Sequence, residues 1–251
     1  MRLSLFEIET VVKLKNKYFN KNDKIYLFGS RVDDSKKGGD IDLFIDLENK
    51  EQEYYDEKQK FIAELQEHLG EQKIDLVISQ DSNRLIEMEA KKGIELDLDK
   101  IKLHKYLNEC DKHLQRIEEA YSDIEESIPL SVGKYKTLSK DEVQAIDQYL
   151  YRFSKLQDTL GQKIFRLILN IYDPLDESIP FIDVLNKLEK LDFLESAKEW
   201  INLRDKRNKI AHQYDDEPYE MTQAINDILT QKDIIKAIYL KIKHKAEANL
   251  I

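Results

Sequence analysis

Two patterns of hydrophobic and polar residues divide the 251-residue chain. In its N-terminal part, short runs rich in β-branched and aromatic side chains, KIYLFG, DIDLFIDL and KIDLVIS, are bounded by glycine, aspartate or lysine, as short strands are. Two stretches with the apolar periodicity of a helix accompany them. One begins with a capping box made by Ser4 and Glu7, and the other covers 56–69 and ends before Gly70. We therefore predict a small mixed-sheet domain over residues 1–97.

A helical period replaces the strand pattern from about residue 99 onward. The amphipathic stretches cover 99–126, 139–171, 181–212 and 219–248. All four prolines lie after residue 128, between these stretches, and no strand-like run separates one stretch from the next. We therefore predict an all-α bundle over residues 98–251 and an α+β fold class for the whole chain.

Composition excludes several classes of protein. The chain has 50 acidic and 40 basic side chains, and neither half carries the basic excess needed to grip a long nucleic-acid backbone. The single cysteine, Cys110, cannot form an internal disulfide, and no run of about 18 apolar residues exists to span a bilayer. Glu7 and Glu9 lie where a signal peptide would have its apolar stretch, so we expect a cytoplasmic protein with no membrane contact. Four histidines without metal-ligand spacing are expected on solvated helical faces: His68, His104, His113 and His244.

Three aspartates lie in the predicted strands. Asp40 and Asp42 open the second strand, and because strand side chains alternate, both project to the same side of the sheet. Asp75 is an acid inside the apolar run of the third strand. Carboxylates this close repel each other unless a cation lies between them, and Mg²⁺ with a nucleoside triphosphate is the usual occupant. The three aspartates therefore predict a metal site.

A Gly-Ser pair at the end of the first strand adds to this chemistry. Gly29 lets a backbone amide approach a phosphate closely, and the Ser30 hydroxyl can donate to a phosphate oxygen. With Asp40 and Asp42 holding two metal ions, Asp75 would complete the second metal site and help deprotonate the incoming hydroxyl. The set fits in-line transfer from a triphosphate. Taken separately, Gly-Ser is also compatible with a plain turn and Asp-x-Asp with an exposed strand edge.

In this order the residues resemble the minimal nucleotidyltransferases of the DNA polymerase beta superfamily. The pattern of that superfamily is a strand, Gly-Ser, a short linker, Asp-x-Asp and a third acidic residue on a later strand. LFGSRVDDSKKGGDIDLFID followed by KIDLVI matches it within residues 1–97. The resemblance implies a magnesium-dependent nucleotidyltransferase with ATP as the donor, and it says little about the acceptor.

A second motif lies near the end of the third helical stretch, WINLRDKRNKIAHQYDDEP. On a helix, Arg207 and Tyr214 lie about 20° apart and His212 about 140° from Arg207, so the trio converges only where the helix loosens. A histidine beside a fixed cation could cleave RNA without a metal: His212 would move the 2′-hydroxyl proton and Arg207 would neutralise the phosphorane. A helix end where Arg207 pairs with neighbouring acids and His212 caps carbonyl groups also accounts for these residues.

The pattern Arg-Asn-x-x-x-His-x-Tyr on a helical domain resembles the HEPN family, over about residues 100–248. Separately encoded pairs of a HEPN protein and a nucleotidyltransferase act as toxin and antitoxin: the HEPN partner is a ribonuclease, and the transferase silences it by attaching AMP to the motif tyrosine. The resemblance thus implies that Tyr214 is the acceptor and that RNA is the substrate of the helical half. Both halves lie on one chain here, which differs from the usual two-gene arrangement.

Our interpretation is a fused antitoxin and toxin that modifies Tyr214. We expect a homodimer through the helical halves, because one His212 cannot easily supply both the base and the acid for cleavage. The first alternative is a small-molecule nucleotidyltransferase whose helical half binds a substrate such as an aminoglycoside. The second is an inactive transferase scaffold that holds an RNA-binding or ribonuclease bundle.

Overall fold

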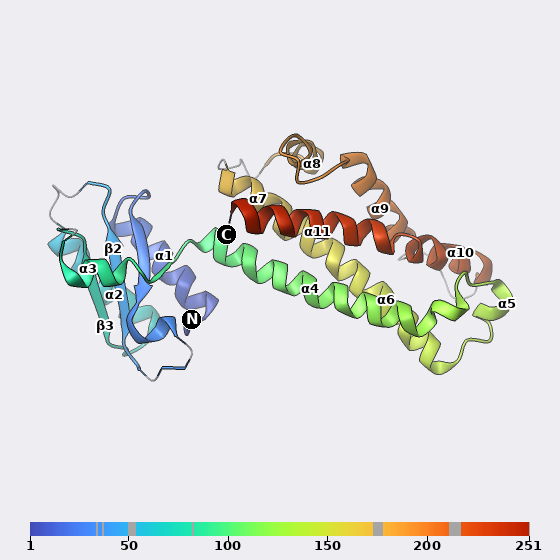
Figure 1. The fold of residues 1–251 in the computed structure, drawn as a ribbon, viewed down its shortest axis with the longest axis horizontal. Coiled ribbons are helices and arrows are strands. Elements are labelled where there is room, and N and C mark those ends of the chain that lie inside the picture. Colours follow the sequence, from blue (N-terminus) through green and yellow to red (C-terminus); the bar gives the residue numbers. More distant parts are fainter. Residues whose placement is uncertain are drawn as a thin grey trace. The chain divides into compact units, whose positions relative to one another are not determined.

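The computed structural model describes residues 1–33, 35–36, 38–49, 54–81, 83–172, 178–210 and 217–250. The contacts divide the chain into two compact units, Met1–Ile101 and Lys102–Ile251. A mixed sheet with helices is followed by a helical region, so the predicted α+β class is confirmed (Figure 1). Within the described ranges, no helix has the length and apolar character that a membrane span needs.

The N-terminal unit is a four-stranded sheet with three helices. Its elements are α1 (Leu5–Tyr18), β1 (Lys24–Phe28), a 3₁₀ turn (Gly29–Val32), β2 (Ile41–Asp46), α2 (Tyr55–Leu69), β3 (Ile74–Ile78), α3 (Leu85–Ala90) and β4 (Ile94–Glu95). The strand order is β3-β2-β1-β4, with β2 and β3 parallel and the other two pairs antiparallel. The predicted capping box is present, with the Ser4 hydroxyl accepting from the Glu7 amide.

Strand alternation gives this sheet two different faces. The face that carries Ile41, Leu43 and Ile45 of β2 is fully buried against α1 and α2. The side chains between them point to the opposite face, where Asp46 pairs with Lys91 just after α3. Burial of each large apolar side chain contributes about 1.5–3 kcal/mol, so this core fixes the register of β2 and with it the direction of its polar side chains.

Two short elements of this unit were not predicted. The strand β4 has only two residues, too few for an alternation to be visible. The helix α3 exposes three large apolar side chains, Leu85, Ile86 and Met88, so its sequence has no apolar stripe. Both elements are held by neighbours distant in sequence, because β4 pairs with β1 and α3 contacts β1 and β2.

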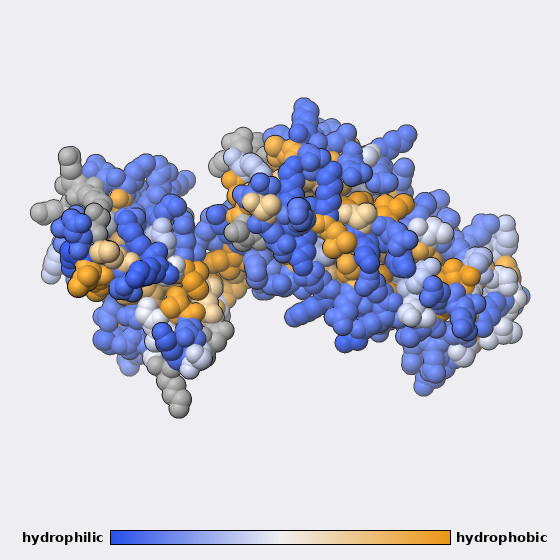
Figure 2. All heavy atoms as spheres, viewed as in Figure 1, coloured by the Kyte–Doolittle hydropathy of each residue, from blue (hydrophilic) through white to orange (hydrophobic). Residues whose placement is uncertain are grey.

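The second unit is built of helices around one apolar core. Its main helices are α4 (Leu98–Ile124, which begins in the first unit), α6 (Lys140–Asp158), α7 (Phe165–Tyr172), α8 (Phe181–Lys190), α9 (Ala197–Ile210), α10 (Pro218–Leu229) and α11 (Lys232–Asn249). A short helix, α5 (Val132–Tyr135), precedes α6, and a π-helical segment, Thr159–Ile164, joins α6 to α7. The surface drawn in Figure 2 is hydrophilic over most of both units.

The expectation that all four histidines outside the Arg207 motif are solvated is wrong for His113. Its side chain is 7% exposed, and His68, His104 and His244 are exposed. His113 follows Cys110 by three positions and so falls on the buried face of α4. Burial, together with the nearby Arg152 guanidinium, lowers its pKa, so the imidazole is held neutral between Arg152 and Glu109.

Candidate active site

Three carboxylates meet at one end of the parallel strand pair. Asp42 of β2 and Asp75 of β3 are register partners, so their side chains leave the same face of the sheet on neighbouring strands. Asp40 lies two residues before Asp42 and therefore on that face as well. The structure thus brings together the three aspartates that the strand pattern singled out.

Lys73 is a fourth member of this cluster, and the sequence analysis missed it. Its ammonium nitrogen lies 2.7 Å from Asp40 Oδ2 and 3.0 Å from Asp75 Oδ2. These two hydrogen-bonded carboxylates raise the pKa of Lys73, which stays charged at any physiological pH. A signal was available, because Lys73 lies two residues before Asp75 and so projects from the same face.

Asp42 occupies the most enclosed position of the three. Burial, then the charges of Asp75 and Asp40, raise the pKa of its carboxyl, while Lys73 and Arg31 act in the opposite direction. The carboxylate is thus held where its charge is disfavoured and only partly compensated by the cations around it.

Gly29 makes the room that the Asp42 carboxylate occupies. A Cβ atom added at Gly29 would lie 2.1 Å from Asp42 Oδ2, and the backbone there has a φ of +71°, which favours glycine. The turn after β1 and the first aspartate inside β2 are therefore fitted to one another, because Phe28 and Asp42 are register partners. The structure therefore requires glycine at position 29 because the Asp42 carboxylate lies so close to it. The sequence had suggested a different reason, the close approach of a phosphate.

Arg2 holds the Ser30 turn in place. Its guanidinium donates to the Ser30 carbonyl at 2.9 Å and to the Gly38 carbonyl at 3.0 Å, so it ties both ends of the loop before β2. A Cβ atom added at Gly38 would lie 2.1 Å from Ser30 Oγ, which shows how closely the loop covers that hydroxyl. No local sequence signal connects Arg2 to residues 28 and 36 positions away.

A second arginine, Arg31, anchors the same loop from the other side. Its guanidinium donates to the Gly39 carbonyl at 2.5 Å and to Gln72 Oε1 at 2.7 Å, and it lies 3.5 Å from a Glu7 carboxylate oxygen. The guanidinium thus connects the start of α1, the loop before β2 and the residues before β3. Two arginines that the sequence analysis did not select therefore hold the loop that leads into β2, where Asp40 and Asp42 lie.

Comparison with known families identifies this domain. Residues 11–101 match the family described as polymerase beta, nucleotidyltransferase. The N-terminal unit contains a nucleotidyltransferase domain. The matched range includes Gly29, Ser30 and the three aspartates. No curated protein and no solved structure matched the chain.

The transfer of a nucleotidyl group, which the description of the matched family implies, starts from a nucleoside triphosphate and typically uses a divalent cation. Among the described residues, no group of three or more histidine, cysteine, aspartate or glutamate side chains has the arrangement of a metal site. In this structure, the Lys73 ammonium pairs with Asp40 and Asp75. The donor set nevertheless fits a hard divalent cation, because it consists of carboxylate oxygens at one end of the sheet. Asp40, Asp42 and Asp75 are the residues that would hold it.

The raised pKa of Asp42 gives a prediction for stability. Because the folded-state pKa lies above the unfolded value, the charged carboxylate destabilises the fold above that pKa, and the penalty disappears as the pH falls through the raised pKa toward 3.8. Without divalent cations, Asp42→Asn should therefore raise the melting temperature at pH 7, by a margin that shrinks with acidification. Thermal unfolding followed by circular dichroism across this pH range measures it.

Asp46→Asn on the same strand is the control, because Asp46 is paired with Lys91 at 2.7 Å and should show no such gain. A lower melting temperature of Asp42→Asn at pH 7 would contradict the assignment.

The second motif is only partly within the described residues. Arg207 lies in the last turn of α9, where its Nε donates to Gln157 Oε1 at 3.0 Å and its Nη2 to Asp158 Oδ1 at 2.8 Å. Arg207 is thus paired with the end of α6, about 50 positions earlier. Asp215 and Asp216, which follow the motif, lie outside the described residues, so the alternative in which Arg207 pairs with neighbouring acids stays open. Asn208 is half-buried on α9, and His212 and Tyr214 lie outside the described residues.

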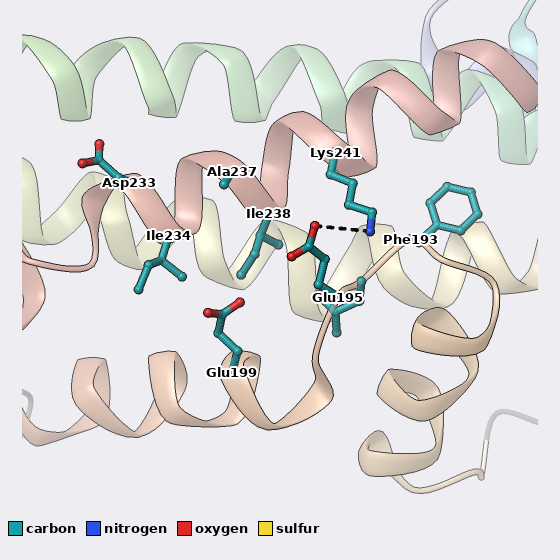
Figure 3. A pocket seen from close by; sticks show the side chains of 9 residues that line it. Phe193, Glu195, Glu199, Asp233, Ile234, Ala237, Ile238 and Lys241 are labelled. Carbon is teal, nitrogen blue, oxygen red and sulfur yellow. Dashed lines mark ion pairs between the residues drawn. The ribbon is translucent and has the colours of Figure 1, made fainter.

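An acidic cavity lies elsewhere in the helical unit, between α9 and α11. It measures about 300 Å³, and Figure 3 shows Glu199 of α9 and Asp233 of α11 at its rim. Lys241 reaches across to Glu195, with 3.6 Å between the ammonium and the carboxylate. Its apolar floor includes Ile234, and none of its described lining residues carries an unpaired buried donor, so this cavity offers little to an anionic ligand.

Proposed function

We propose that the nucleotidyltransferase domain transfers AMP from ATP, with Mg²⁺, to Tyr214 of the helical unit. The observation that carries the transfer is the meeting of Asp40, Asp42 and Asp75 beside the Gly29 turn. The acceptor follows from the Arg207 motif, which resembles the HEPN motif whose tyrosine receives AMP. This assignment deepens the general activity that the family match supplies.

Each residue of the site has a definite part in this reaction. Mg²⁺, when bound, would neutralise the triphosphate and align its α-phosphorus for in-line attack. Asp40, Asp42 and Asp75 would hold the cation, and Asp75 would also accept the proton of the attacking tyrosine hydroxyl. The tyrosine oxygen forms a bond to the α-phosphorus as the bond to pyrophosphate breaks, so AMP stays on the protein and pyrophosphate leaves.

Intact mass spectrometry tests this proposal. After incubation with Mg²⁺ and each nucleoside triphosphate in turn, the chain should gain the mass of one or more AMP residues with ATP, and release pyrophosphate in equal amount. Pyrophosphate release that requires an added aminoglycoside and leaves the protein mass unchanged would favour the small-molecule alternative. Absence of both products with every triphosphate would leave the inactive scaffold.

Lys73 gives this site an internal cation that a metal ion must displace. Lys73→Met should raise the affinity of the nucleotide-free protein for a divalent cation several-fold, because it removes the ammonium that pairs with Asp40 and Asp75, two of the three carboxylates that would hold the cation. A Mn²⁺ titration followed by electron paramagnetic resonance measures this affinity directly. Lys36→Met is the matched control, since the Lys36 ammonium lies 4.0 Å from Asp33 and pairs with none of the three aspartates. Unchanged or weaker Mn²⁺ binding by Lys73→Met would show that the ammonium does not compete with the metal.

The helical unit would act as a metal-independent ribonuclease in the same proposal. His212 would move the 2′-hydroxyl proton of the RNA, and Arg207 would stabilise the charge that develops on the phosphorus. What supports this role is the fixed position of Arg207, which Gln157 and Asp158 hold from a neighbouring helix.

A further inference from the structure

A basic cavity of about 310 Å³ lies in the helical unit beside Arg207. Three guanidinium groups line it: Arg204 and Arg207 from one face of α9, three residues apart, and Arg166 from α7. Asp158 is the one acidic side chain among the described residues of the lining, so these residues carry three positive charges and one negative charge, a net charge of +2. In a chain with a formal net charge of −10, such a cavity concentrates positive charge locally.

Two of these guanidinium groups have no carboxylate partner in the part of the chain that the structure describes. Arg207 is paired with Asp158, whereas Arg166 donates from Nη2 to the Ile179 carbonyl at 3.0 Å. The Arg204 guanidinium lies over the Phe181 ring, 5.6 Å from its centroid. Among the residues that the structure describes, no acid pairs with Arg166 or Arg204. Within the described ranges, neither of these two positive charges is neutralised by a carboxylate.

Two buried side chains of the lining also carry unpaired donors. Gln157 is 2% exposed and Trp200 is 1% exposed, yet Gln157 Nε2 and Trp200 Nε1 have no hydrogen-bond partner among the described residues. The Gln157 carbonyl oxygen already accepts from Arg207, which fixes the orientation of its amide. Buried N–H groups are almost always hydrogen-bonded in folded proteins, so two donors without partners in the lining of one cavity point to an acceptor supplied by a ligand.

The backbone beside these donors departs from a regular α-helix at the cavity. The π-helical segment Thr159–Ile164 directly follows Gln157 and Asp158, and such segments are frequent at functional sites. Gly161 in this segment allows the Trp200 indole to come close, because a Cβ atom there would lie 3.1 Å from the indole ring. Gln157 and Trp200, whose side chains carry the two unpaired donors, thus line the same cavity as this segment's glycine.

We propose that this cavity binds the phosphate group of a nucleotide. Guanidinium, amide and indole N–H groups are all donors, and a ligand rich in acceptors with negative charge satisfies them together. The volume exceeds that of a phosphate alone and leaves room for the attached nucleoside beside Phe181. The phosphate can come from a free nucleotide or from an RNA backbone. The site shares Arg207 with the proposed ribonuclease motif, but it requires neither nucleotide transfer nor cleavage.

Trp200 provides the measurement, because it is the single tryptophan of the chain and lines the cavity. The full chain carrying Asp42→Asn, in EDTA, is titrated with AMP, inorganic phosphate and a 2′-deoxy-substituted single-stranded oligonucleotide that cannot be cleaved. EDTA and Asp42→Asn together suppress metal-dependent binding in the transferase domain. We expect a saturable change in tryptophan emission with AMP or with the oligonucleotide, weakened by added salt.

Substitution of Arg204 makes the test specific. In Arg204→Gln, binding should weaken by at least about tenfold, since a hydrogen-bonded guanidinium–phosphate contact is lost, and Arg204→Lys should retain part of it. Lys198→Gln is the matched control, because Lys198 is an exposed cation of α9 outside the cavity. Binding by AMP points to a free nucleotide, and binding by the oligonucleotide alone points to an RNA backbone. The proposal is overturned if the tryptophan emission of the parent protein changes with neither AMP nor the oligonucleotide, or if Arg204→Gln binds with parental affinity. Either result holds whatever the outcome of the AMP-transfer assay.

Discussion

Asp42→Asn should abolish AMP transfer while leaving the fold intact. The substitution keeps the shape of the side chain beside Gly29 and removes the charge that the metal site requires. Because even outer partners of a metal site cost about 10–100-fold in affinity or activity when removed, the loss of a direct ligand should exceed a hundredfold. The rate of AMP gain, measured by intact mass spectrometry with Mg²⁺ and ATP, gives this ratio.

The expected loss has a matched control on the same strand. Asp46→Asn removes a carboxylate from the same face of β2, but that carboxylate is paired with Lys91 and lies four residues beyond Asp42. Its transfer rate should stay within about threefold of the parent's, since a surface ion pair contributes little. An Asp42→Asn protein that transfers AMP at the parent's rate would remove Asp42 from the metal site, and equal losses in both variants would indicate a general effect on the sheet.

The carboxylate cluster could be predicted because strand alternation is a strictly local rule. Asp40 and Asp42 differ by two positions, so they share a face whatever the rest of the fold does. Their meeting with Asp75 needed only that β2 and β3 be neighbours, and the βαβ order of β2, α2 and β3 makes that pairing common. The residue types then determined the chemistry.

The surroundings of the cluster depend on contacts that no local pattern contains. Arg2 reaches the Ser30 turn only because α1 begins beside it, and Arg31 meets Gln72 across 41 positions of sequence. Lys73 is the exception, since it shares a strand face with Asp75 and could have been selected by the same alternation rule. Its ammonium is the cation that competes with a metal ion for Asp40 and Asp75.

The helical half shows where periodicity stops being sufficient. The stretch predicted as 181–212 is two helices, α8 and α9, because the chain turns at Asp192 with a φ of 60°. Glycine or proline usually marks such a break, and neither occurs between 181 and 210. The stretch predicted as 219–248 likewise divides into α10 and α11 at Thr230. In both cases the apolar period continues across the turn, so the pattern has no visible interruption.

Tyr214→Phe should eliminate the AMP gain of the parent protein. The phenol oxygen is the proposed nucleophile, and phenylalanine removes that oxygen and little else. Attachment of AMP would add a negative phosphodiester and a bulky nucleoside close in sequence to Arg207, whose guanidinium is held at 2.8 Å from Asp158. The cation would then pair with the attached phosphate, and RNA would be excluded by both charge and volume. Intact mass spectrometry of the two proteins after incubation with Mg²⁺ and ATP measures the difference.

The same reasoning determines what each variant should do in a growing host. Asp42→Asn blocks modification, so the helical unit should remain an active ribonuclease and slow growth on expression. Adding His212→Ala to Asp42→Asn should restore growth, because the proton-transferring group is gone while Arg207 and its partners on α6 remain. Tyr219→Phe is the control for the mass measurement, since Tyr219 is an exposed tyrosine at the start of α10, five positions beyond Tyr214. One AMP on the Tyr214→Phe protein and none on the Tyr219→Phe protein would show that Tyr219 is the acceptor. The attached phosphate would then lie outside the Arg207 motif, and the argument that its charge silences the ribonuclease would no longer apply.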